Sequence, residues 1–192
     1  EDLYLQTTAF ANGLKRMGVK RGDRVVALMP NIPETVISFL ATVSIGGIWS
    51  SCSPEFGISS VVDRFRQIEP KVLISIDGYK YKGIDYNLVS SVVDLQRSLP
   101  TLENTIIVPY LDEKPELDKV IKPKIWHDEL LPTSELLLEP VPFEHPLWIL
   151  YSSGTTGLPK PIVQGHGGIL LEHLKSLSLH LDLREDDRFF WF

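Results

Sequence analysis

The sequence predicts an α/β fold in which a mostly parallel sheet is flanked by helices on both faces. Strand patterns alternate with helical patterns of ten or more residues through the first hundred residues, which is typical of successive βαβ units. The alternation resumes with an apolar run at residues 147–151. With 192 residues, 43% of them hydrophobic, the chain is long enough to bury a core of its own.

Apolar spacing and turn residues predict each element in order. The first helix is indicated by a mainly apolar face that recurs at three- and four-residue steps, at Leu3, Thr7, Phe10, Leu14 and Met17. Further along the chain we expect a strand over residues 24–29, a helix over 33–46, a strand over 48–51, a strand over 71–76, a helix over 85–99 and a strand over 105–108. Ser60 and Asp63 have the spacing of a capping box, which predicts a helix that starts there and ends near residues 69–70.

Residues 109–146 differ in composition from the rest of the chain. They hold seven of the fourteen prolines, and nine acidic residues against four lysines. Such a segment is expected to be a solvated surface excursion within one domain, with short elements such as one around residues 126–131. A linker between domains is the alternative.

Charge and composition exclude several classes of protein. A net charge of −6 argues against a nucleic-acid partner, for which a basic face is expected. No stretch approaches the roughly 18 continuous apolar residues of a membrane span, and the first residues do not resemble a signal peptide. The single cysteine, Cys52, permits no disulfide within the chain, so we expect a cytoplasmic protein.

The last five residues, 188–192, form an apolar run that is typical of a strand. If unpaired, such a run would promote aggregation. This run and the lack of an initiator methionine favour a piece of a longer protein. A terminal strand docked in the chain's own sheet is the alternative.

Residues 151–160 read Tyr-Ser-Ser-Gly-Thr-Thr-Gly-Leu-Pro-Lys and predict a loop that binds phosphate. Glycines let successive backbone N–H groups turn toward an anion. Hydroxyls supply further donors and can contact a Mg²⁺ ion carried by the phosphates, and the lysine adds a positive charge. An ordinary turn is the alternative, but a hairpin needs only about two to five loop residues.

Two common phosphate loops are excluded. The Walker A loop places Gly immediately before its Lys and a helix directly after it, whereas here Pro159 precedes Lys160 and residues 161–165 indicate a strand. No Gly-x-Gly-x-x-Gly pattern, the mark of a dinucleotide-binding turn, occurs in the chain. The loop is therefore expected to join two strands, as in a hairpin.

This loop resembles the signature of the adenylate-forming superfamily, which includes acyl-CoA synthetases, luciferases and the adenylation domains of peptide synthetases. The resemblance extends over the chain, for example through Gly-Asp-Arg-Val-Val-Ala-Leu-Met at residues 22–29. Residues 50–57, 63–73 and 165–175 most resemble the branch that activates acetoacetate. Pro161 is a departure, because many relatives have Gly there, and it removes a backbone donor.

The resemblance implies that residues 1–192 are part of the large amino-terminal, AMP-binding domain of an ATP-dependent ligase, without its carboxy-terminal domain. In such enzymes a carboxylate attacks ATP to form an acyl-adenylate, and the thiol of CoA then displaces AMP. The residues implied to contact the ATP phosphates are Ser152, Ser153, Gly154, Thr155, Thr156, Gly157 and Lys160, with Thr155 also near Mg²⁺. No catalytic residue is expected within the chain, so these residues alone are expected to be inactive.

The implied substrates are ATP, CoA and acetoacetate or a similar short acid. Contacts to the acid, the adenine and the ribose are expected beyond residue 192. A ligase for acetate or propionate therefore remains an alternative, and so does a module that binds ATP without catalysis. The oligomeric state is not predicted.

Residues 79–83, Tyr-Lys-Tyr-Lys-Gly, form a second candidate site. Lys80 and Lys82 could hold a phosphate while the tyrosines stack on a base. Resemblance to acetate-activating synthetases implies that this loop meets the nucleotide end of CoA. An ordinary exposed loop is the alternative.

Three histidines, His166, His173 and His180, recur every seven residues and are expected to share a half-buried helix face. Two turns separate neighbours by roughly 10 Å, too far to share one metal ion. The triplet His-Gly-Gly at residues 166–168 resembles an esterase motif, but no Gly-x-Ser-x-Gly nucleophile occurs. Buried packing roles are expected for Cys52 and for the tryptophans Trp49, Trp126 and Trp148.

Overall fold

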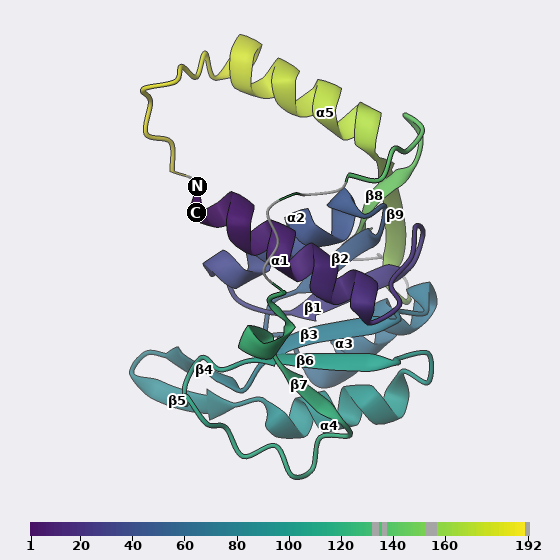
Figure 1. The fold of residues 1–192 in the computed structure, drawn as a ribbon, viewed down its shortest axis with the longest axis vertical. Coiled ribbons are helices and arrows are strands. Elements are labelled where there is room, and N and C mark those ends of the chain that lie inside the picture. The colour runs from purple at the N-terminus through teal and green to yellow at the C-terminus, as the bar shows by residue number, and fades with distance from the viewer. Residues whose placement is uncertain (132–134, 136–137, 153–156, 191–192) are drawn as a thin grey trace.

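The computed structural model describes residues 1–131, 135, 138–152 and 157–190 and confirms the predicted α/β class (Figure 1). Within these residues a seven-stranded sheet has the order β7-β6-β3-β1-β2-β8-β9. Its strands are β1 (Arg24–Leu28), β2 (Ile48–Cys52), β3 (Val72–Ile76), β6 (Asn104–Val108), β7 (Pro123–Ile125), β8 (Pro146–Ser152) and β9 (Lys160–Gly165). All neighbours run parallel except β8 and β9, which are antiparallel.

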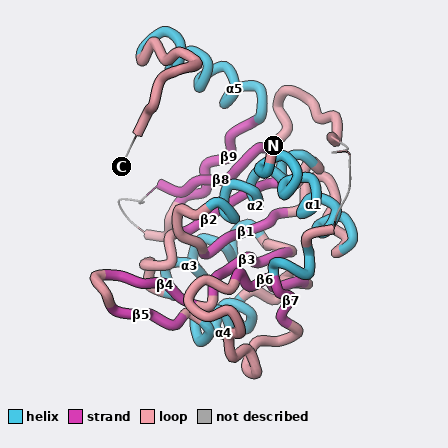
Figure 2. Tube along the Cα trace, turned by 60° about the vertical axis from the view of Figure 1, so that its left-hand side comes forward, coloured by secondary structure: helices cyan, strands magenta, loops and turns pink. Residues whose placement is uncertain are grey.

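Helices cover both faces of the sheet (Figure 2). They are α1 (Asp2–Arg16), α2 (Pro33–Ser44), α3 (Ile58–Phe65) and α4 (Val89–Ser98). A further helix, α5 (His166–Lys175), buries none of its residues. The path from β1 to β2 moves one way across the sheet, and the paths from β2 to β3 and from β3 to β6 move the other way. Right-handed crossovers therefore place α2 on one face and α3 and α4 on the opposite face. In agreement, α1 packs on α2, and α3 packs on α4.

The core lies around the central strands, which are apolar at nearly every position. Val25, Val26 and Ala27 of β1 and Leu73 and Ile74 of β3 are all fully buried. A strand covered by helices on both faces cannot alternate apolar and polar residues. The continuous apolar runs seen in the sequence follow from this burial.

One expected helix begins later than predicted, because a hairpin precedes it. The predicted helix over 85–99 is in fact β5 (Ile84–Asn87) followed by α4, and β5 pairs antiparallel with β4 (Gly78–Tyr81). The turn consists of Lys82 and Gly83, with φ angles of 49° and 78°, as a two-residue hairpin turn requires. Because residues 88–99 have helical spacing, the sequence predicted one helix that also included most of this short strand.

The predicted capping box is wrong. Helix α3 has Gly57 at its N-cap, without a side-chain cap, so Ser60 lies inside the first turn. The Ser60 hydroxyl instead accepts a hydrogen bond from the guanidinium of Arg64, one turn later. The short 3₁₀ helix η1 (Arg66–Ile68) then extends α3, so the predicted end near residues 69–70 is correct.

The proline-rich segment 109–146 returns to the core in its middle. It contributes β7 to the sheet edge and the 3₁₀ helix η2 (Trp126–Glu129). Trp126 is 1% exposed and its ring lies 4.0 Å from that of Phe10 in α1. The buried carboxylate of Glu129 pairs with Arg16 and, at 3.4 Å, with Lys124. These contacts fasten the segment to the first helix.

Replacing Trp126 tests this attachment. Trp126→Ala should lower the free energy of unfolding by roughly 3–5 kcal/mol, because it leaves a large cavity beside Phe10. Ile121→Ala, in the same segment but 62% exposed, should change it by less than about 0.5 kcal/mol. Urea denaturation of both variants measures the difference. Equal losses would show that the segment is not anchored through Trp126.

Candidate functional site

The predicted site residues belong to segments that follow β3 and β8 (Figure 1), two strands that run in the same direction within the sheet. β1, β2, β3, β6 and β8 all run in the same direction, so the loops that follow them meet at this carboxyl edge. The loop after β1 leads to α2, whereas those after β2 and β3 lead to helices on the other face. Such a reversal opens a crevice, which is the usual place for ligands in open α/β sheets.

The predicted phosphate loop joins β8 to β9, as the sequence analysis expected. Ser152, the last residue of β8, pairs with Lys160, the first residue of β9. Gly157 is exposed and has a φ of 128°, a conformation that residues with a Cβ rarely adopt. The other predicted phosphate contacts lie outside the described residues, and they are Ser153, Gly154, Thr155 and Thr156.

Helix α3 and the η1 turn after it hold both arms of this loop. The side-chain amide of Gln67 donates to the carbonyl of Pro159 at 2.8 Å, directly before Lys160. On the other arm, the Tyr151 hydroxyl donates to the carbonyl of Arg64 at 2.9 Å, and the Arg64 guanidinium lies 5.8 Å from the centre of the Tyr151 ring. The sequence analysis missed Arg64 and Gln67, because nothing in their local pattern indicates a partner about ninety residues away.

Tyr151 acts as a hydrogen-bond donor over a wide pH range. Burial raises the pKa of Tyr151 to about 12, although a hydrogen bond with Ser50 opposes this change. The hydroxyl therefore stays protonated at neutral pH. It remains available to donate to the Arg64 carbonyl and fix the entry to the loop.

A polar crevice of about 350 Å³ lies at the switch point. It is bounded by segments that follow four strands, namely Met29–Asn31 after β1, residues 53–55 after β2, Tyr79 and Lys80 after β3, and Tyr110 after β6. Ser51, Cys52 and Thr35 complete its lining. The crevice therefore offers hydroxyls, an amide and the charges of one lysine and one glutamate to a ligand.

The structure separates the two lysines predicted to hold CoA. Lys80 lines the crevice and also lies 3.3 Å from Asp85 across the hairpin. Lys82 is not among the lining residues, and its ammonium group lies over the ring of Tyr81 at 5.3 Å. Tyr79 and Tyr86 stack on each other, with ring centres 5.2 Å apart, so part of the predicted aromatic surface is already covered.

Cys52 lies in the wall of the crevice as a buried thiol, in agreement with its predicted packing role. Burial raises its pKa to about 11, and the positive charge of Arg64 opposes this only in part. Its thiol is therefore neutral at physiological pH. A neutral thiol is a poor nucleophile, so Cys52 is suited to shaping the crevice.

The predicted half-buried histidine face is wrong. His166 is partly buried, but His173 and His180 are exposed, because α5 projects from the sheet edge at β9 and buries none of its residues (Figures 1 and 2). His166 faces His145 at 5.7 Å, whereas His173 faces Trp148 at 5.8 Å. Desolvation lowers the pKa of His166, and His145 lowers it further.

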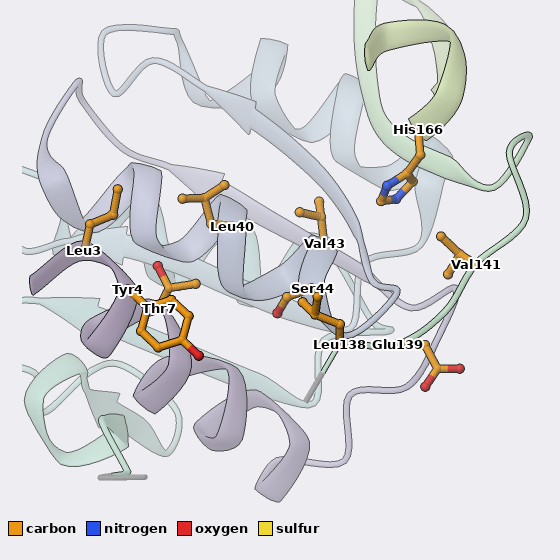
Figure 3. Close-up of a pocket in the computed structure, with 10 residues that line it drawn as sticks. All are labelled: Leu3, Tyr4, Thr7, Leu40, Val43, Ser44, Leu138, Glu139, Val141 and His166. Carbon is orange, nitrogen blue, oxygen red and sulfur yellow. The ribbon is translucent and has the colours of Figure 1, made fainter. Parts of the chain in front are cut away.

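An apolar cavity of about 500 Å³ is lined by residues of α1, of α2, of the segment before β8 and by His166 at the start of α5. Figure 3 shows His166 and Val141 at one end of it and Leu3 and Tyr4 at the other. Among the described residues predicted to bind ATP or CoA, none lines this cavity. The candidate site therefore stays at the carboxyl edge.

Among the described residues of the apolar run at 188–192, residues 188–190 form no strand, and Phe190 is 84% exposed. The strand predicted there is thus absent from the described residues. Within the described part of the chain, none of the helices is both long and apolar enough to cross a membrane.

Comparison with known proteins identifies the family to which this fold belongs. The family model described as "AMP-binding enzyme" matches residues 1–192. The chain therefore belongs to the AMP-binding enzyme family.

Individual relatives show which kind of protein within this family the chain resembles. The chain is 43% identical to the acetoacetyl-coenzyme A synthetase of Rhizobium meliloti, in an alignment that covers 100% of this chain and 30% of that protein. It is 40% identical to the acetoacetyl-CoA synthetase of Gallus gallus, over 97% of this chain and 29% of that protein. The solved structure of acetoacetyl-CoA synthetase from Streptomyces lividans matches with a TM-score of 0.93 at 49% identity, and the match covers 100% of this chain and 29% of that one.

These similarities confirm the predicted superfamily and the predicted branch within it. The chain spans less than one third of the length of the relatives that it matches. The activity of the whole protein is therefore a matter of proposal.

The state of Cys52 can be tested by alkylation. At pH 8 a thiol with a pKa of about 11 is about 0.1% thiolate, against roughly a quarter for an ordinary thiol with a pKa of about 8.5. Iodoacetamide should therefore label Cys52 at least about a hundredfold more slowly in the folded chain than in urea. The rate in the folded chain should rise as the pH approaches 11. Comparable rates in the folded and unfolded chain at pH 8 would contradict the burial of this thiol.

Proposed function

We propose that the chain is the amino-terminal part of an ATP-dependent ligase that joins acetoacetate to CoA through an acyl-adenylate. The observation that carries the proposal is the loop of Ser, Thr and Gly between β8 and β9, at the sheet edge that also holds the polar crevice. The names of the relatives support acetoacetate as the acid. Because the chain spans only 29–30% of their length, the activity is proposed for the longer polypeptide.

In the first half-reaction, a carboxylate oxygen of the acid attacks the α-phosphorus of ATP. The bond from this phosphorus to the bridging oxygen of the β-phosphate breaks, and pyrophosphate leaves. We assign the hold on the β- and γ-phosphates to Ser152, Gly157, Lys160 and the loop residues between them. Negative charge grows on the leaving group, so fixed N–H dipoles and the lysine stabilise the transition state more than the bound substrate.

A Mg²⁺ ion on the phosphates fits this arrangement. The residues that the structure describes include no group of three His, Cys, Asp or Glu able to hold a metal ion by themselves. The phosphate oxygens would thus supply most of its ligands, with a loop hydroxyl, that of Thr155, beside them. When bound, the ion neutralises charge on the phosphates.

In the second half-reaction, the thiol sulfur of CoA attacks the acyl carbon of the adenylate. The new S–C bond forms while the C–O bond to AMP breaks, and AMP leaves with that oxygen. We assign the nucleotide end of CoA to the switch-point crevice, where Lys80 meets its phosphates and Tyr79 lies beside them. Lys82, on the turn of the same hairpin, is kept as a weaker contact, because it lies outside the crevice lining.

The compartment proposed for the enzyme is the reducing cytoplasm, which is consistent with a single cysteine that is buried and unpaired.

The acid is tested by ATP–pyrophosphate exchange with the full-length protein across acetoacetate, acetate and propionate. Acetoacetate should give the highest kcat/KM. A higher kcat/KM with another acid would identify that acid as the substrate in place of acetoacetate. A lack of exchange with every acid would favour a module that binds ATP without activating an acid. The 192-residue chain alone should support no exchange, because we place the acid pocket and the catalytic residues in the remaining polypeptide.

Lys160 provides a direct test of the phosphate loop. In the full-length protein, Lys160→Ala should lower the rate of ATP–pyrophosphate exchange by about a hundredfold, because it removes a charge that stabilises the leaving pyrophosphate. Lys175→Ala is a matched control, because this exposed lysine pairs with Glu172 on α5, away from the loop. An unchanged exchange rate in Lys160→Ala would remove Lys160 from the ATP site.

Variants of the two hairpin lysines distinguish CoA binding in the crevice from CoA binding at the hairpin turn. Lys80→Ala should raise the KM for CoA roughly tenfold, the effect of about 1.4 kcal/mol, and should leave ATP–pyrophosphate exchange within twofold of wild type. Lys82→Ala should raise the KM for CoA by a smaller factor. Steady-state kinetics at constant ionic strength measure both. If both variants kept the wild-type KM, the assignment of CoA to this crevice would be wrong.

A further inference from the structure

Asp77 is a buried carboxylate that the predicted chemistry does not use. It follows β3 directly and is 4% exposed. Its side chain accepts hydrogen bonds from three successive backbone N–H groups of the segment after β6. Tyr110 donates to Oδ1 at 2.6 Å and Asp112 donates to Oδ2 at 2.9 Å, while Leu111 lies between them at 3.1 and 3.2 Å from the two oxygens.

The backbone of the same residue holds a second segment. The carbonyl of Asp77 accepts the N–H of Leu88 at 2.8 Å, directly after β5. The β4–β5 hairpin is therefore closed at its base by Asp77, which lies immediately before it. A single residue thus binds the base of the hairpin and the start of the segment that follows β6.

These two segments form one side of the switch-point crevice. Tyr79 and Lys80 come from the hairpin and Tyr110 from the segment after β6. Lys80 and Tyr110 are exposed, so core packing holds them weakly, whereas Tyr79 is partly buried against the core. The β4–β5 hairpin is also hydrogen-bonded as a separate two-stranded sheet. The position of this wall consequently depends on the hydrogen bonds made by Asp77.

An ionised carboxylate suits this task better than a neutral side chain. Both oxygens of Asp77 accept N–H groups, and hydrogen bonds to a charged acceptor are roughly twice as strong as neutral ones. An asparagine in the same position would present an NH₂ group to one of these N–H donors. It would leave at least one of these N–H groups without its side-chain acceptor.

We propose that Asp77 is a positioning residue for the thiol substrate, which acts by holding Tyr79, Lys80 and Tyr110 in place around the crevice. The inference rests on the proposed function, which puts the nucleotide end of CoA in this crevice. The hydrogen bonds of Asp77 join it to residues 88 and 110–112, and none reaches the described residues of the loop after β8. Its replacement should therefore affect the second half-reaction and spare the first.

The test uses the full-length enzyme with Asp77→Asn, Tyr110→Ala and Asp23→Asn. Asp23 is the matched control because its carboxylate also accepts a backbone N–H, that of Lys20 at 2.9 Å, but it precedes β1 and so lies at the opposite edge of the sheet. Tyr110→Ala removes part of the wall without altering the buried carboxylate. It therefore gives a result even if Asp77→Asn does not fold.

We expect Asp77→Asn to raise the KM for CoA about tenfold, with ATP–pyrophosphate exchange within twofold of wild type. Tyr110→Ala should raise this KM in the same selective way, and Asp23→Asn should change neither quantity. Hydrogen exchange should be faster in Asp77→Asn at residues 110–112 and at residue 88. Together with Lys80→Ala, Asp77→Asn should raise the KM by less than the product of the two separate effects, because both act on the same wall.

Three results would overturn the inference. An equal loss of both half-reactions in folded Asp77→Asn would show a general structural role. A wild-type KM for CoA in Asp77→Asn or in Tyr110→Ala, while Lys80→Ala raises it, would show that CoA binds the crevice without depending on Asp77. If Lys80→Ala also leaves the KM unchanged, the assignment of CoA to the crevice fails, and the inference fails with it. The Lys80→Ala result thus distinguishes the two failures.

Discussion

The common direction of the strands is the constraint on which the candidate site depends. Because β1, β2, β3, β6 and β8 run parallel, their carboxyl ends meet at a single edge. The geometry of the sheet alone therefore brings together loops that are far apart in sequence. Adjacent strands are about 4.8 Å apart. The end of β2, in the crevice wall, therefore lies one strand spacing from the end of β8, where the phosphate loop begins.

Helix α3 connects the crevice with the predicted phosphate loop after β8. Its N-cap is Gly57, two residues after the crevice residues 53–55. Near its end the Arg64 carbonyl accepts a hydrogen bond from one arm of the predicted phosphate loop, and Gln67 in the η1 turn donates one to the other arm. Arg64 also lies 5.2 Å from the ring centre of Phe56, at the entry to the helix. A single short helix thus follows the crevice residues and contacts both arms of the predicted phosphate loop. A displacement of this helix would therefore affect the crevice and the loop together.

The central fold could be predicted from the sequence because its signals are local. Continuous apolar runs marked β1 and β3, and the Ser/Thr/Gly composition of residues 151–160 marked a loop between two strands. The β4–β5 hairpin was missed because its four-residue strand carries weaker periodicity than the helix that follows it. The capping box failed because Ser60 has a partner, Arg64, that matters only once the helix has started at Gly57.

Parts of the candidate site could not be predicted because they depend on tertiary contacts. The tether from Gln67 to Pro159 and the three N–H groups gathered by Asp77 each join segments from different βα units. The exposure of His173 and His180 likewise depends on what α5 packs against, which heptad spacing does not reveal. Spacing can predict which residues share a helix face, but not whether that face is covered.

The separate hydrogen bonding of the β4–β5 hairpin has a consequence for how such a protein diversifies. None of its ladder bonds belongs to the seven-stranded sheet, so insertions, deletions or charge reversals at its tip leave the core strands unchanged. The hairpin nevertheless supplies Tyr79 and Lys80 to the crevice. Evolution can therefore alter the lining of the crevice at this point while the residues that maintain the fold remain under independent selection.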